Sequence, residues 1–214
     1  MLFPRRLPLL LAMTLIPPAC AANPPAAATP HAAPARVLLA RTLETDWFQA
    51  PVAGRPTISL AIEGGDLVLS GSRKLPAFCM PGDHANAFTE GLWNFDCAEA
   101  FLLNPENGSY LEINLSPHGA WWACLFSAPR VRATPHGMQL PGVAGRGTAT
   151  SQGWQTQWRI PLANLPKELA FSPGTTRANL TFCLDREPQR HLTLHDLGGG
   201  KPDFHRPEKW AKVE

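Results

Sequence analysis

The sequence predicts an all-β protein, an antiparallel β-sandwich in a single domain, and three observations support this. Short segments with alternating apolar and polar residues recur along the chain, which is typical of strands with one buried face. Turn-forming Gly, Pro and Asn-Gly residues separate these segments. No segment shows the long apolar period of an amphipathic helix, which excludes a helical bundle.

The expected strands follow in order along the chain. The segment 57–62 alternates and is followed, across Gly64-Gly65, by a second strand over 66–70, which is a hairpin signal. The central segment 92–130 contains three strands, of which the first two cover 98–103 and 110–115. Later strands are expected over 154–160 and 179–184, and a single helical turn over 161–165.

The central segment defines its own turns. NPENGS, with Asn107-Gly108, supplies the positive φ that a tight hairpin needs, and SPHG supplies the next turn. Between them, residues 110–115 alternate strictly: Leu111, Ile113 and Leu115 point to one face. Glu112 and Asn114 point to the other face, which therefore offers hydrogen-bonding groups on a rigid sheet.

This segment also carries a family resemblance. The elements LW…DCAEAFL, YLEINLSPHGAWWACLF and the tail GGGKPDFHRPEKW resemble DOMON-like domains related to family 9 carbohydrate-binding modules. The resemblance implies a β-sandwich that binds a sugar or, in some branches, haem. It also implies that the tail recurs in the family. We expect the tail to be a strap that packs Phe204 and Trp210 onto the sandwich, with Asp203 and His205 at the rim of a site.

The N-terminus predicts export. Residues 1–22 have two Arg, a short apolar stretch and small residues near the end, as in a secretory signal peptide, and the apolar stretch is too short to span a membrane. Cys20 offers a second interpretation, a lipid-modified cysteine that anchors the mature protein. The Ala/Pro-rich residues 23–36 predict a flexible tether, and 37–214 the folded domain. We expect a periplasmic or secreted protein.

Four cysteines of the domain are disulfide candidates, because an exported protein meets an oxidising compartment. They are Cys79, Cys97, Cys124 and Cys183. Three connectivities are open, of which we favour Cys79–Cys97 with Cys124–Cys183. The spacings are not those of zinc ligands, so no metal site is expected.

A ligand site is predicted on the polar faces of the strands. The outward residues Glu112, Asn114, Gln157, Arg159, Asn179 and Thr181, together with Glu99, would supply the donors and acceptors that sugar hydroxyls require. Tryptophan rings would stack on the sugar, with Trp93, Trp121 and Trp122 the nearest candidates, and Trp121 preferred to Trp122. The first set of ligand-binding residues is therefore Trp93, Glu99, Glu112, Asn114 and Trp121.

The most consistent function is non-catalytic carbohydrate binding, and three alternatives remain open. A haem-binding electron-transfer domain would draw its axial ligands from Met80, His84, His136 and Met138. A structural or interaction protein of the cell envelope would bind no small ligand. A glycoside hydrolase would use a pair among Asp96, Glu99 and Glu112. The net charge of +2 is too small to indicate nucleic-acid binding.

Overall fold

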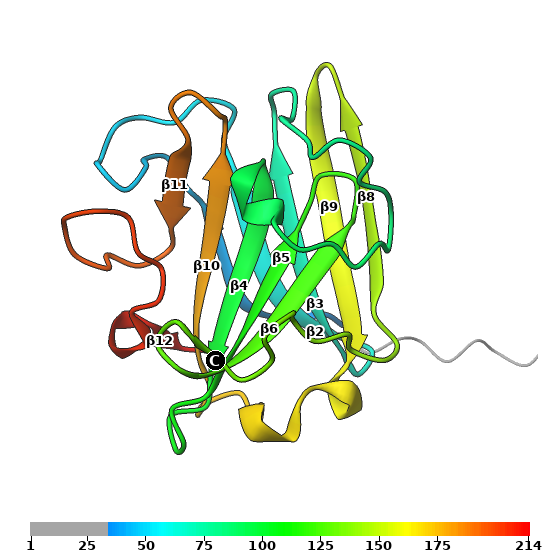
Figure 1. The fold of residues 1–214 in the computed structure, drawn as a ribbon, viewed down its shortest axis with the longest axis vertical. Helices are drawn as coiled ribbons and strands as arrows, with labels where there is room; N and C mark the ends of the chain where they lie inside the picture. The colour runs from blue at the N-terminus through cyan, green and yellow to red at the C-terminus, as the bar shows by residue number, and fades with distance from the viewer. Residues whose placement is uncertain (1–33) are drawn as a thin grey trace, which may run out of the picture. The chain divides into compact units, whose positions relative to one another are not determined.

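The structure, a computed structural model, describes residues 34–214 and shows the predicted antiparallel β-sandwich (Figure 1). One sheet has the strand order β1-β2-β3-β9-β8, and the other has the order β11-β10-β4-β5-β6-β7, with β12 paired to β10. The strands of the first sheet are β1 (Arg36–Thr42), β2 (Thr57–Glu63), β3 (Asp66–Arg73), β8 (Ala144–Thr150) and β9 (Gly153–Pro161). Those of the second are β4 (Cys97–Leu103), β5 (Tyr110–Leu115), β6 (Trp121–Ala128), β7 (Val131–Arg132), β10 (Arg177–Leu184), β11 (Arg190–Thr193) and β12 (Ala211–Lys212).

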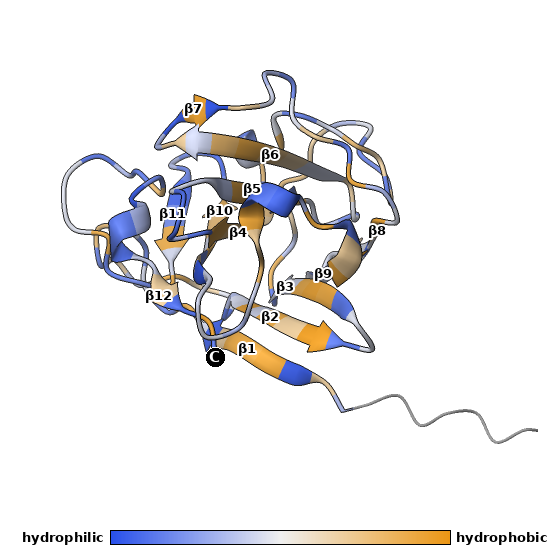
Figure 2. Ribbon diagram, turned by 90° about the horizontal axis from the view of Figure 1, so that it is seen from below, coloured by the Kyte–Doolittle hydropathy of each residue, from blue (hydrophilic) through white to orange (hydrophobic). Residues whose placement is uncertain are grey.

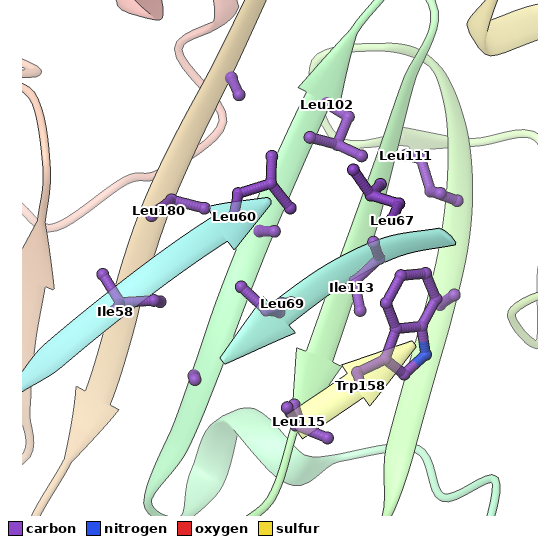
Figure 3. Close-up of a cluster of buried hydrophobic side chains, with 14 of the residues drawn as sticks. Ile58, Leu60, Leu67, Leu69, Leu102, Leu111, Ile113, Leu115, Trp158 and Leu180 are labelled. Carbon is purple, nitrogen blue, oxygen red and sulfur yellow. The ribbon is translucent and has the colours of Figure 1, made fainter. Parts of the chain in front are cut away.

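The main core lies between the two sheets. The apolar faces of the predicted strands meet there, with Leu60 and Leu69 opposite Leu102, Leu111 and Leu180 (Figure 3). Every second residue of β5 enters this core, which confirms the alternation predicted for 110–115. Because a one-residue slip would turn this whole set away from the core, the pattern fixes the register of the strand.

The turns follow the predicted chemistry. Gly64 and Gly65 have φ of 58° and 91° in the β2–β3 hairpin, and Gly108 has φ of 75° between β4 and β5. Gly119, in the SPHG turn, has φ of 88°, and a Cβ there would lie 2.5 Å from the backbone of Arg146. The 3₁₀ helix Leu162–Asn164 is the helical turn expected after β9. By contrast, β1, β8 and β11 were not predicted, since their sequences do not alternate cleanly.

A second apolar cluster covers the outer face of the larger sheet. The cluster joins residues of β4, β5, β6 and β10 to Trp47, to Leu92 and to the C-terminal segment with Phe204 and Trp210. In Figure 2 the C-terminal segment passes beside β10 and β11. The prediction that the tail packs Phe204 and Trp210 onto the sandwich is confirmed. The polar residues of this face are consequently buried rather than exposed.

The predicted signal peptide (1–22), Cys20 and nearly all of the tether (23–36) lie outside the described residues. At the end of the tether, Arg36 already belongs to β1. Within residues 34–214 no helix is long and apolar enough to cross a membrane.

A buried arginine joins the two sheets. Arg73, at the end of β3, donates through Nη1 and Nη2 to both carboxylate oxygens of Asp185, at 2.7 and 3.1 Å, just after β10. Its Nη1 also lies 3.8 Å from Asp96, whose side chain is fully buried. Removal of Arg73 would leave a buried carboxylate without its cation.

We therefore expect Arg73→Ala to lower the free energy of unfolding by about 3 kcal/mol, because breaking a buried ion pair leaves an uncompensated charge. Urea denaturation of the full chain measures this. Arg159→Ala is the matched control, since its pairs with Glu63 and Asp66 are partly exposed and it should cost less than about 1 kcal/mol. Equal losses for the two variants would contradict the role given to Arg73.

Candidate functional site

A pocket of about 340 Å³ opens on the outer face of the larger sheet. Its floor is formed by strand residues, and its walls by the Leu92–Asn94 helix, by the segment after β6 and by the C-terminal strap, which we define as residues 198–210. The lining residues are Trp93, Glu99, Phe101, Glu112, Phe126, Arg130, Arg132, Cys183, Gln189, His191, Pro202, Asp203, Phe204 and His205.

Two glutamates from neighbouring strands form the polar part of the floor. Glu99 on β4 pairs in register with Asn114 on β5, and Glu112 is opposite Phe101. The two carboxyl groups are therefore diagonal neighbours on one surface, and both are more than nine-tenths buried. Burial raises the pKa of each, and the charge of Glu99 raises that of Glu112 further.

Glu112 is held by its neighbours with one oxygen toward the strap. Asn114 Nδ2 donates to Glu112 Oε1 at 2.8 Å, and Glu112 Oε2 lies 3.8 Å from His205 Nε2. Asn114 is completely buried and does not line the pocket. Its structural role is thus to position Glu112.

Glu99 has a different environment. Thr181 Oγ1 donates to Glu99 Oε2 at 2.7 Å. The thiols of Cys97 and Cys183 point at the other oxygen, Oε1, at 3.6 and 3.8 Å. Both carboxyl oxygens of Glu99 are therefore contacted by side chains of β4 and β10.

A hydrogen-bonded chain ties the strap to the sheet. The backbone N–H of Arg130 donates to Tyr110 Oη at 3.0 Å, and this hydroxyl lies 2.7 Å from His205 Nδ1. The hydroxyl hydrogen is then free to donate to Nδ1, which leaves the proton of a neutral imidazole on Nε2, facing Glu112. Burial, with the nearby charge of Arg130, lowers the pKa of His205 to about 4.

Trp93 forms another wall of the pocket, and the Arg132 side chain packs over its ring. The Trp93 ring packs edge-on against Trp122, with centroids 5.2 Å apart. The Arg132 guanidinium lies over both rings, at 5.8 and 4.9 Å, and its Nη1 donates to Glu90 at 2.6 Å. Trp93 is only partly buried, so its ring is available to a ligand.

The structure brings together only part of the predicted polar patch. Gln157 and Arg159 lie on β9, in the other sheet, where Arg146 Nη2 donates to Gln157 Oε1 at 2.6 Å. Gln157 lines a separate polar surface with Ser59 and Ser70. The prediction that these two residues share a face with Glu112 is wrong, because the alternation of one strand does not reveal which sheet it joins.

Neither Trp121 nor Trp122 is exposed, so the preference for Trp121 as an exposed ring is corrected. Trp121 pairs with Leu115 and points into the core between the sheets, where it packs on Phe88. Trp122 points to the pocket side but is fully buried beneath Trp93 and Arg132. Of the first set, Trp93, Glu99 and Glu112 line the pocket.

The four cysteines of the domain are free thiols, and the favoured pairing is not observed. Cys97 and Cys183 face one another on β4 and β10. Cys79 lies 4.0 Å from His118, and Cys124 contacts Thr134. Cys97 thus has Cys183, and not Cys79, as its neighbour, because β10 pairs with β4.

The haem ligands considered from the sequence are not gathered in this pocket. Met80 packs against the outer cluster and Met138 against the core between the sheets. His84 and His136 are exposed. None of the four lines the pocket.

Several pocket residues carried no sequence signal. Arg130 and Arg132 follow β6, Gln189 immediately precedes β11, and His191 lies in β11, a strand that was not expected. The KPDFH motif was the one available signal for the strap side. Its Asp203 Oδ1 accepts from Arg130 Nη2 at 2.8 Å.

Comparison with known proteins identifies the family. The UPF0462 protein C4orf33 homolog of Mus musculus is 30% identical over 181 residues, covering 78% of this chain and 86% of that protein. The chain belongs to the UPF0462 family. The Homo sapiens member is 27% identical, with 76% and 81% covered. No protein-family model matches, so the DOMON-like part of the resemblance stays a prediction.

Solved structures share the fold. A "putative carbohydrate-binding protein" from Bacteroides uniformis superposes with a TM-score of 0.61 at 16% identity, over 81% of this chain and 84% of that one. A family 9 carbohydrate-binding module from Caldicellulosiruptor kristjanssonii, in complex with cellotriose, gives a TM-score of 0.45 at 10% identity, over 76% and 74%. The Bacteroides uniformis structure therefore shares its β-sandwich fold with this UPF0462 chain.

The environment of His205 predicts its titration. Its pKa of about 4 is below the ordinary 6.5, so the imidazole stays neutral in the folded protein down to about pH 4. The unfolded chain binds this proton near pH 6.5, whereas the folded chain binds it only near pH 4. The stability that neutral His205 contributes is therefore fully present above pH 6.5, and it is lost as the pH falls from 6.5 to 4. NMR titration of the His205 ring measures the midpoint. A midpoint near 6.5 would contradict the buried, neutral state.

Proposed function

We propose that this UPF0462 protein is a non-catalytic binding protein for a carbohydrate. The observation that carries the proposal is the convergence, in one pocket, of a partly exposed indole with ionisable and amide groups. Trp93 forms one wall, and Glu112, Arg132 and Asp203 supply hydrogen-bonding groups around it. Indole rings stack on sugar C–H faces, while hydroxyls need both donors and acceptors.

The dimensions fit one small ligand. A volume of about 340 Å³ is near the lower end of small-molecule sites, which span about 300–1,000 Å³. The "putative carbohydrate-binding protein" from Bacteroides uniformis shares the fold, which supports the same ligand class. The expected export of the chain would place such a pocket where saccharides of the cell envelope are available.

The arrangement of carboxyl groups favours binding over hydrolysis. A glycoside hydrolase needs two carboxyl groups on either side of the bond that is cleaved. Glu99 and Glu112 instead stand side by side on adjacent strands of one floor. Asp96, the third residue considered, is buried away from the pocket beside Arg73.

Calorimetry of the full chain against a panel of mono- and oligosaccharides tests the proposal. For a saccharide that binds, Trp93→Ala should weaken affinity about tenfold or more, which corresponds to about 1.4 kcal/mol. Glu112→Gln should weaken it similarly, because it removes an acceptor facing the pocket while keeping the side-chain volume.

Gln157→Ala is the control, since Gln157 lies on the outer face of the other sheet, and it should leave affinity unchanged. A panel without any binding, or binding that is lost in Gln157→Ala and kept in Trp93→Ala, would overturn the proposal.

A further inference from the structure

The floor of the pocket contains a cluster of two thiols and a carboxyl group whose arrangement the proposed sugar binding does not explain. Cys97 and Glu99 are two residues apart on β4 and point to the same face. Cys183, on β10, is the register partner of Cys97. One ligand atom from each of these three side chains lies within 4.8 Å of the other two.

The cluster has an unusual charge environment. Glu99 is only 2% exposed, yet within residues 34–214 no Lys, Arg or His forms an ion pair with it. A buried carboxylate without a cation is costly, whereas two thiols facing it are weak donors. A cation held between the three groups would remove this cost.

The distances suit a tetrahedral zinc ion. With Zn–S of about 2.3 Å and Zn–O of about 2.1 Å, a tetrahedral ion separates sulfur from oxygen by about 3.6 Å. Glu99 Oε1 lies 3.6 Å from the Cys97 sulfur and 3.8 Å from the Cys183 sulfur. Both sulfur–oxygen separations therefore already have nearly the spacing of a zinc tetrahedron, and the two sulfurs lie within 4.8 Å of one another.

We propose that Cys97, Cys183 and Glu99 bind a zinc ion at the floor of the pocket, with the fourth coordination position open to the pocket. The two thiols bind as thiolates, and their protons pass to solvent as the ion enters. Glu99 and Cys183 both line the pocket, which gives the ion a path of entry and leaves room for a water or a ligand hydroxyl.

The surroundings orient the carboxylate for this role. The Thr181 hydroxyl holds Glu99 Oε2 at 2.7 Å, so that Oε1 is directed at the sulfurs. Such hydrogen bonds to a ligating group tune metal affinity by about 10- to 100-fold. Thiolate sulfur selects zinc over calcium or magnesium, which prefer oxygen ligands.

Cobalt(II) and zinc titration of the full chain, reduced and freed of metal, tests the proposal. We expect one equivalent of cobalt to give a cobalt–thiolate charge-transfer band and the visible bands of a tetrahedral ion, and one equivalent of zinc to displace it. Cys97→Ser and Cys183→Ser should each lower affinity more than 100-fold. Thr181→Val should lower it about 10- to 100-fold.

Cys124→Ser is the matched control, because Cys124 is a buried cysteine on the same face that contacts Thr134 and not Glu99. Cys79→Ser is a second control, since Cys79 lies beside His118 and Asp83 in a separate cluster. Both should keep the cobalt spectrum. Circular dichroism checks folding, and Cys97→Ala replaces Cys97→Ser if the serine variant does not fold.

Three results would overturn the proposal. They are the absence of a thiolate band in the reduced wild-type protein, a band that persists in Cys97→Ser or depends on Cys79, and a Cys97–Cys183 disulfide in protein isolated without reductant. Because the readout is metal spectroscopy, it is independent of the outcome with saccharides.

Discussion

Burial of two carboxyl groups on the outer face of the larger sheet is the constraint on which the rest of this structure depends. Glu99 and Glu112 would be solvated on an ordinary sandwich, but here the C-terminal strap and the Leu92–Asn94 helix cover their strands. Such burial is unfavourable unless hydrogen bonds or charges compensate it. The polar side chains of Asn114 and Thr181 supply part of that compensation through hydrogen bonds to Glu112 and Glu99.

The same constraint creates the pocket. The strap crosses the sheet without filling the space above Glu112, because Asp203 accepts a hydrogen bond from Arg130 and His205 is hydrogen-bonded to Tyr110. Phe204 and Trp210 anchor the strap on either side, against Trp47 and Phe101. An opening of fixed shape with carboxyl groups at its floor follows from this anchoring, which is the preorganisation that a binding site needs.

The sequence was sufficient to predict the fold class and the core. In residues 110–115, strict alternation indicated which face enters the core between the sheets, and glycines indicated the hairpin turns. Strand β8 could not be predicted, since AGRGTAT has small residues on both faces. Of the site residues, Trp93, Glu99 and Glu112 were identified from the motif, and all three line the pocket.

Other features of the site could not be read from local patterns. Trp121 was assigned to the wrong surface because WWACLF is apolar on both faces, so the motif does not show which of Trp121 and Trp122 faces the core between the sheets. Arg132 and Gln189 reach the pocket through the folding of segments distant in sequence. Cys97 and Cys183, 86 residues apart in the sequence, face one another only because β4 pairs with β10, a separation that spacing rules for zinc motifs do not cover.

We infer that the ligand enters the pocket beside the C-terminal strap and not the polar surface of the other sheet. Amide chemical-shift mapping by NMR, during titration of the isotopically labelled chain with a saccharide that binds, tests this most directly. We expect shifts at Trp93, Glu112 and in the strap around His205, with Gln155 and Gln157 unchanged. Shifts confined to Gln155, Gln157 and their neighbours on β8 would place the ligand on the other sheet and contradict this site.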